Sequence, residues 1–132
     1  MDFLYQDPYP ILKDDTHYKK LTSDYVKVEQ LGDREILVVD PKGLELLAQE
    51  AMDDVSFMLR SAHLQKLRNI IEDPEATDND RFVAYNLLQN AAVAVEGQLP
   101  SCQDTGTAIV VAKKGENVYT GVEDGEWLSK GI

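Results

Sequence analysis

The residues with the greatest chemical capacity lie together in one short segment, Cys102-Gln103-Asp104-Thr105-Gly106. A thiol can bind a metal or act as a nucleophile, a carboxylate can take or give a proton, and an amide can donate and accept hydrogen bonds. The segment stands between an expected helix and an expected strand, and loops held by rigid elements often carry binding and catalytic residues. The residue types leave open the alternative that Cys102 is simply a small apolar side chain in a polar turn.

Three site chemistries can be considered for this loop from residue types. A nucleophilic thiol needs a cation or a histidine beside it, and Asp104 disfavours the thiolate, although His17 or His63 could fold nearby. One cysteine and two widely separated histidines do not form a zinc-ligand spacing pattern. Asp104-Thr105-Gly106 matches the active-site tripeptide of aspartic proteases, but there the tripeptide follows an apolar strand in an all-β dimer. The loop alone decides none of these.

Three consecutive helices are expected before the loop, near residues 41–59, 62–72 and 78–96. Asp40 and Pro41 are typical of a helix start, and Pro74 ends the second helix because its ring clashes with a continuing helix. Gly97 is placed to end the third helix in a left-handed conformation. The apolar residues expected to face inward on this third helix are Phe82, Tyr85, Leu88, Ala92 and Val95.

Two β-hairpins are expected around these helices. The first joins β-type runs at 25–28 and 35–39 through a Gly-Asp turn, and the second pairs 107–112 antiparallel with 117–120 through a Lys-Gly turn. Residues 1–23 form an extended N-terminal arm with two prolines and several aromatics, and a further short helix begins near Asp124. The predicted fold class is therefore α+β: an arm and a hairpin, three helices and a second hairpin, as a piece of a larger α/β domain.

Composition restricts the partners. The 132 residues include 13 Lys plus Arg against 24 Asp plus Glu, a net charge of −11, without the positive surface that nucleic acid or an anionic membrane requires. A single cysteine cannot form an intramolecular disulfide, which is compatible with a reducing compartment. The beginning of the chain resembles no signal peptide, and no apolar run is long enough to cross a bilayer. We therefore expect a cytoplasmic protein that binds neither nucleic acid nor membranes.

The loop and its flanks, residues 97–108, resemble the N-terminal signature of class I, iron–sulfur-dependent fumarate hydratases. The resemblance extends over nearly the whole chain, with mild departures at Ser61 and at residues 122–124. Further segments match in order and spacing: Asp14-Asp15-Thr16, Leu21-Thr22-Ser23, Ser56-Phe57-Met58-Leu59-Arg60, Ala62-His63-Leu64-Gln65, Asp73-Pro74-Glu75-Ala76 and Lys113-Lys114-Gly115.

This resemblance implies roles for the loop residues. Cys102 matches one of three thiolate ligands to a [4Fe–4S] cluster in which one iron has no protein ligand. Gln103 and Asp104 match residues that contact the dicarboxylate substrate, and Asp104 is the catalytic candidate because it can also handle a proton. The implied reaction is the reversible interconversion of (S)-malate and fumarate, which needs Lewis acidity and no redox change. Tartrate-type dehydratases are similar enough to remain an alternative.

The resemblance also implies that residues 24–132 are the N-terminal portion of the iron–sulfur (alpha) domain, truncated at the C-terminus. The other ligands and the catalytic base would then lie outside this chain, in the rest of the polypeptide or in a beta subunit, and the parent enzyme would be a homodimer. Alone, the chain is expected to hold no cluster and to be inactive. A non-catalytic acidic α+β interaction module is the competing interpretation, and it should cover the apolar residues at 3–9 and 127–132.

Overall fold

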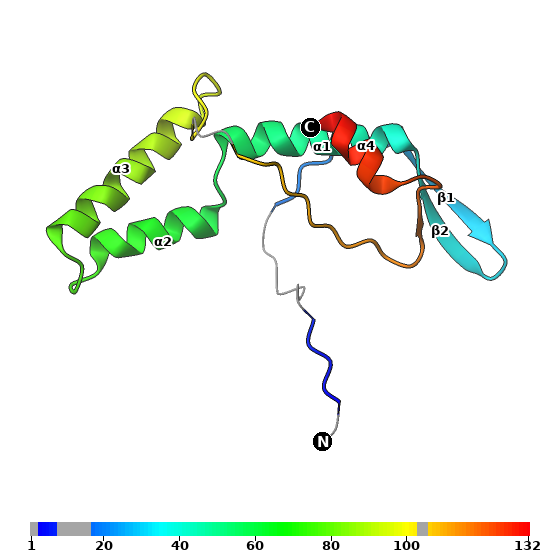
Figure 1. Ribbon diagram of the computed structural model, residues 1–132, viewed down its shortest axis with the longest axis horizontal. Coiled ribbons are helices and arrows are strands. Elements are labelled where there is room, and N and C mark those ends of the chain that lie inside the picture. Colours follow the sequence, from blue (N-terminus) through cyan, green and yellow to red (C-terminus); the bar gives the residue numbers. More distant parts are fainter. Residues whose placement is uncertain (1–2, 8–16, 103–105) are drawn as a thin grey trace.

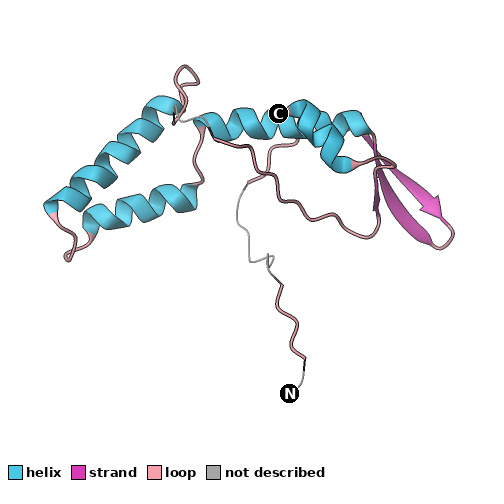
Figure 2. Cartoon of the chain, in the orientation of Figure 1, coloured by secondary structure: helices cyan, strands magenta, loops and turns pink. Residues whose placement is uncertain are grey.

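The computed structural model describes residues 3–7, 17–102 and 106–132. Helices and strands occur together (Figure 2), which confirms the α+β class, and residues 3–7 and 17–22 carry neither. The described elements, in chain order, are β1 (Val26–Leu31), β2 (Arg34–Val39), α1 (Pro41–Phe57), α2 (Ser61–Glu72), α3 (Asp78–Ala94), β3 (Val118–Tyr119) and α4 (Asp124–Gly131).

The first predicted hairpin is confirmed. Strands β1 and β2 pair antiparallel from Val26 opposite Val39 to Leu31 opposite Arg34. Gly32 occupies the turn with a φ of 61°, a left-handed conformation that favours glycine. The local turn signal was therefore sufficient to predict this pairing.

The second predicted hairpin is wrong. Strand β3 pairs with β2 in parallel, with Val118 opposite Leu37, and the backbone N–H of Leu37 donates to the carbonyl of Asn117 at 2.8 Å. Residues 107–112 form no strand but part of a long connection that returns to the sheet (Figure 1). The physical reason is that β1 occupies only one edge of β2, so the other edge still has backbone groups that β3 can satisfy.

Helix α1 begins as predicted, since the side chain of Asp40 accepts a hydrogen bond from the backbone N–H of Lys42 at 2.9 Å and Pro41 follows it. Helix α4 lies along α1 (Figure 1), and Ala48 is buried at 4% exposure. Gly131 makes this packing possible: an added Cβ would lie 2.1 Å from the backbone oxygen of Glu45 and 2.8 Å from the Cβ of Ala48. The α1–α4 contact therefore depends on the absence of a side chain at this position.

Replacing Gly131 tests this packing. Gly131→Ala should destabilise the docking of α4 by about 1–3 kcal/mol, the usual cost of overpacking, because a backbone atom of α1 cannot move aside easily. Gly125→Ala in the same helix is the matched control, since nothing lies within 4 Å of the added Cβ, and it should be neutral or slightly stabilising. Urea unfolding followed by Trp127 fluorescence measures both variants, and equal midpoints would contradict the predicted close contact.

Helices α2 and α3 form a helical hairpin, in which Leu67 and Ala84 are buried. The predicted inward face of α3 is largely wrong, because Phe82 and Tyr85 are 67% and 53% exposed. Small side chains occupy the contact, and they allow the two backbones to approach closely. The residues of α3 that are buried or half-buried are Arg81, Ala84, Leu88, Ala91 and Ala94.

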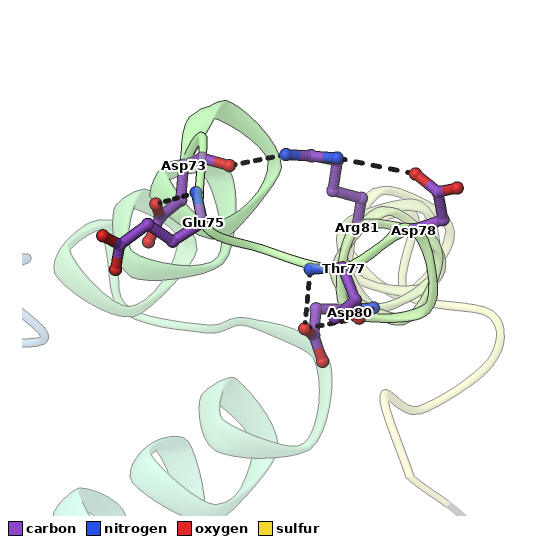
Figure 3. Close-up of polar contacts among 6 residues, drawn as sticks. All are labelled: Asp73, Glu75, Thr77, Asp78, Asp80 and Arg81. Carbon is purple, nitrogen blue, oxygen red and sulfur yellow. Dashed lines mark hydrogen bonds and ion pairs between the residues drawn. The ribbon is translucent and has the colours of Figure 1, made fainter.

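The turn between α2 and α3 is fixed by polar contacts (Figure 3). The hydroxyl of Thr77 accepts from the backbone N–H of Asp80 at 3.2 Å, and the backbone N–H of Thr77 donates to the Asp80 carboxylate at 2.9 Å, which is a capping box. Arg81 donates to the backbone carbonyl of Asp73 at 2.7 Å and pairs with Asp78 at 3.5 Å. Helix α2 ends at Glu72, before Pro74, as predicted.

The capping box predicts a pH-dependent contribution to stability. Hydrogen bonds from the Thr77 hydroxyl and backbone N–H, with a smaller effect of Arg81, hold the pKa of Asp80 below its ordinary value. A lowered carboxylate pKa stabilises the fold above the unfolded pKa, and this stabilisation is lost as the pH falls through the folded pKa.

Thr77→Ala should therefore lower stability at pH 7 by about 1 kcal/mol, the typical effect of losing an N-cap hydroxyl. The difference from the unsubstituted protein should shrink as the pH falls through the lowered pKa of Asp80, because the carboxylate then becomes protonated. Urea unfolding at pH 7 and pH 3 measures both values. Asp78→Asn is the control, because Asp78 is fully exposed and lies outside the capping box; a pH-independent Thr77→Ala effect would argue against the Asp80 contribution.

The chain exposes far more surface than a compact protein of its mass. The accessible area is 11350 Å², whereas a compact monomer of 14.8 kDa exposes roughly 7,000 Å². In the described part of the chain, the buried apolar residues are four: Ala48, Leu67, Ala84 and Ala94. Much apolar surface is consequently available for contact with further protein.

Candidate functional site

The candidate loop follows α3 directly. Gly97 ends the helical region with a φ of 74°, as predicted, and its backbone N–H donates to the carbonyl of Ala94 at 2.9 Å. Cys102 is exposed. Gln103 and Asp104, the expected substrate contacts, lie outside the described residues, as does Thr105.

Cys102 borders an open groove of about 440 Å³ between the end of α3 and the loop. No histidine lines this groove in the described part of the chain, and His17 lines a different depression beside α1. The groove therefore gives no support to the Cys–His alternative considered above. The groove is lined by Asn90, Val93, Ala94, Leu99, Pro100, Ser101 and Cys102.

Two hydrogen bonds hold the backbone that precedes Cys102. The backbone N–H of Ser101 donates to the carbonyl of Ser56 at 2.8 Å, and the Nδ2 group of Asn90 donates to the carbonyl of Ser101 at 2.6 Å. Ser56 belongs to the last turn of α1 and Asn90 to α3, so two helices fix a single residue of the loop. Sequence reasoning missed both anchors, because no local pattern connects positions this far apart.

The described residues contain no group of three or more His, Cys, Asp or Glu side chains that could hold a metal ion. This chain can contribute one thiolate from Cys102, which is a soft ligand suited to iron in iron–sulfur clusters. Because the thiol is exposed and its loop is anchored, the residues fit the role of one ligand within a larger set. They do not form a complete metal site.

A second polar cluster fixes the segment that follows the loop. Asp124 at the start of α4 accepts hydrogen bonds from Lys114 and from Thr120, and the Lys114 bond, followed by that from Thr120, holds its pKa below the ordinary value. Thr120 is buried at 7% exposure. Lys113 pairs with Asp7 at 2.5 Å, which ties the N-terminal segment to the same connection. These contacts connect the start of α4 to residues 114 and 120, and the N-terminal segment to residue 113.

Comparison with known families identifies the family of this chain. The family model described as fumarate hydratase (fumerase) matches residues 45–132, which include most of α1, all of α2 and α3, the Cys102 loop and α4. The chain therefore belongs to the fumarate hydratase family. This result confirms the resemblance drawn from the loop and its flanks, and it favours neither the aspartic-protease nor the zinc interpretation.

Curated proteins similar to this chain include bacterial enzymes named class I fumarate hydratases. The chain is 54% identical to the anaerobic class I fumarate hydratase of Escherichia coli K12 and 52% identical to the aerobic class I enzyme of the same strain, over 98% of its length in both cases. It is 51% identical to the mitochondrial fumarate hydratase 1 of Leishmania major over 89% of its length. The chain spans about a quarter of the length of these relatives, 24%, 24% and 22% respectively.

None of the helices in the described ranges is both long enough and apolar enough to span a membrane.

The apolar residues that a complete module should cover are partly exposed. Phe3, Tyr5 and Ile132 are 89%, 72% and 55% exposed, whereas Trp127 and Leu128 are half-buried. Tyr9 lies outside the described residues. The expectation of an uncovered surface at 127–132 is therefore only partly met, because α4 packs on α1.

Proposed function

We propose that this chain is part of an iron–sulfur hydro-lyase of the class I fumarate hydratase type, which interconverts (S)-malate and fumarate reversibly. The observation that carries the proposal is an exposed cysteine in an anchored loop, within a chain 54% identical to a class I fumarate hydratase. The residues for the full reaction would be shared with protein outside this chain, since the relatives are about four times as long. We expect the enzyme to work in the cytoplasm.

Cys102 would hold one iron of a [4Fe–4S] cluster through its thiolate. A four-iron cluster needs more protein ligands than one, so the remaining thiolates would come from the rest of the polypeptide or from a beta subunit. The 132-residue chain alone should consequently hold no cluster and show no activity. The exposed apolar residues described above support a role for such additional protein, which would cover them. In a homodimer of the whole enzyme, the second copy would also cover part of this surface.

Gln103 and Asp104 would contact the dicarboxylate substrate next to Cys102. The amide of Gln103 can donate to a substrate carboxylate, while Asp104 can accept from a substrate hydroxyl and take or give a proton. When bound, the cluster supplies Lewis acidity that weakens the bond between carbon and the leaving hydroxyl. The role of this chain is then to present one thiolate and to orient the substrate beside it.

The experiment uses the native polypeptide that contains this sequence, purified without oxygen. We expect about four irons per chain, a visible iron–sulfur absorption band, and turnover of malate and fumarate that exceeds turnover of tartrate. Preferential turnover of tartrate would assign the protein to the alternative dehydratase type. Absence of iron and of hydro-lyase activity would overturn the proposal and favour an acidic interaction module.

A separate measurement tests the expected inactivity of the chain alone. The 132-residue chain is incubated anaerobically with iron and sulfide and then desalted, and its iron content and malate dehydration are measured beside those of the native polypeptide. We expect substoichiometric iron and no turnover, because one thiolate is available. Stoichiometric four-iron binding to a monomer would contradict the assignment of the other ligands to protein outside the chain.

A further inference from the structure

We propose that Asn90 is a positioning residue that holds the backbone of Cys102 in the geometry required for iron binding. This inference rests on the proposed function, in which Cys102 is a cluster ligand, and it assigns a role to a residue of α3 outside the loop. Asn90 donates from Nδ2 to the backbone carbonyl of Ser101 at 2.6 Å. That carbonyl belongs to the peptide group joining Ser101 to Cys102, so the hydrogen bond restricts the orientation of the peptide plane from which the cysteine extends.

The neighbouring peptide group, which joins Pro100 to Ser101, is held by α1. The backbone N–H of Ser101 donates to the carbonyl of Ser56 at 2.8 Å. Ser56 lies in the last turn of α1, where carbonyl groups have no partner within the helix. The contact therefore satisfies the end of α1 and anchors the loop at once. Together the two bonds fix both peptide groups of Ser101 between α1 and α3.

These bonds matter because apolar packing fixes the loop only weakly. Leu99, three residues before Cys102, is 62% exposed, and Cys102 is itself exposed. A metal ligand must be held within about 0.5 Å of its working position, and residues that orient ligands typically change metal affinity or activity by about 10- to 100-fold when replaced. The Asn90 amide, which donates to the Ser101 carbonyl, provides such a restraint.

The test compares Asn90→Asp with Asn86→Asp in the native polypeptide. Asn90→Asp keeps the shape of the side chain but replaces the donor with a carboxylate that repels the Ser101 carbonyl. Asn86 is a matched control: it lies one turn earlier on the same exposed helix and donates from Nδ2 to the carbonyl of Phe82 at 2.7 Å, away from the loop. Both substitutions add the same charge, so a general electrostatic effect should appear in both.

Two readouts other than activity are used. In protein purified with iron, the visible band should disappear about tenfold faster in the presence of a chelator for Asn90→Asp than for the unsubstituted protein or Asn86→Asp. In protein stripped of iron, alkylation of Cys102 by iodoacetamide, followed by peptide mass spectrometry, should be several-fold faster for Asn90→Asp. Asn90→Gln, which keeps the donor on a longer side chain, should recover part of both effects.

The outcomes separate the two proposals. If the unsubstituted polypeptide holds no iron, the proposed function fails, and faster alkylation of Cys102 in Asn90→Asp alone still supports the restraint on the loop. If iron is bound and Asn90→Asp matches Asn86→Asp in both readouts, Asn90 is not a positioning residue. Far-ultraviolet circular dichroism confirms that each variant is folded; should Asn90→Asp unfold, Asn90→Ala replaces it and the same criteria apply.

Discussion

Cys102→Ser should remove most of the iron from the native polypeptide and, with it, malate dehydration. Serine places a hard oxygen that is deprotonated reluctantly where a soft thiolate would bind iron. Cys102 is the sole cysteine of this chain, so no neighbouring residue of the chain can take its place. We expect iron per chain and activity to fall together, with the activity reduced by at least about 100-fold. Iron is measured colorimetrically on anaerobically purified protein, beside the initial rate with malate.

A control in the same loop separates loss of the thiolate from a general disturbance. Leu99→Ser introduces the same hydroxyl three residues earlier, at a side chain that is 62% exposed, and should retain most of its iron. Equal loss of iron from both variants would mean that the loop is merely sensitive to substitution. Full retention of iron in Cys102→Ser would exclude Cys102 as a ligand.

The features that the sequence could predict are those encoded within a few neighbouring residues. Asp40 and Pro41 mark the start of α1, and the predicted and observed helices agree within two residues at every end. Thr77 and Asp80 form their capping box inside one turn, and Gly97 ends the region after α3 in a left-handed conformation. Such signals act locally, so the rest of the chain is not needed to interpret them.

The features that the sequence did not predict depend on contacts between distant segments. Val118 and Tyr119 join the free edge of β2 in parallel, and nothing near the Lys-Gly turn indicates that choice. On α3, alternative apolar stripes differ by a small rotation of the helix, and the contact with α2 selects the one with small residues such as Ala84. Large residues such as Phe82 then face outward. Periodicity identifies a helix but does not say which side meets its neighbour.

The candidate site shows the same division. The polar loop was identified from residue types, because a cysteine, an amide and a carboxylate are adjacent in sequence. Its anchors were not, since Ser56 and Asn90 reach Ser101 only after α1 and α3 have taken their positions. The proposed roles of Gln103 and Asp104 rest on the resemblance to class I fumarate hydratases.

Asp104→Asn should fail differently from Cys102→Ser. Asparagine keeps the size of the side chain but removes its charge and its capacity to take or give a proton. If Asp104 acts on the substrate, the native polypeptide should keep its iron and its visible band, while kcat/KM for malate falls by about 100-fold or more, a typical effect of losing a positioned acid or base. Asp124→Asn is a matched control away from the loop, since Asp124 binds Lys114 and Thr120 at the start of α4; it should leave the kinetics nearly unchanged at temperatures where the variant stays folded.

The iron content of Asp104→Asn then decides whether Asp104 contacts the substrate or supports the structure of the loop. Cys102→Ser, in which the proposed thiolate ligand is lost, sets the reference for a protein without its cluster. A carboxylate that contacts only substrate can be neutralised without affecting the metal, so Asp104→Asn should give full iron and low turnover. A carboxylate that supports the loop would instead release the cluster when replaced, because Cys102 lies two residues away. Loss of iron from Asp104→Asn as complete as from Cys102→Ser would therefore assign Asp104 to the support of the loop and withdraw its proposed contact with substrate.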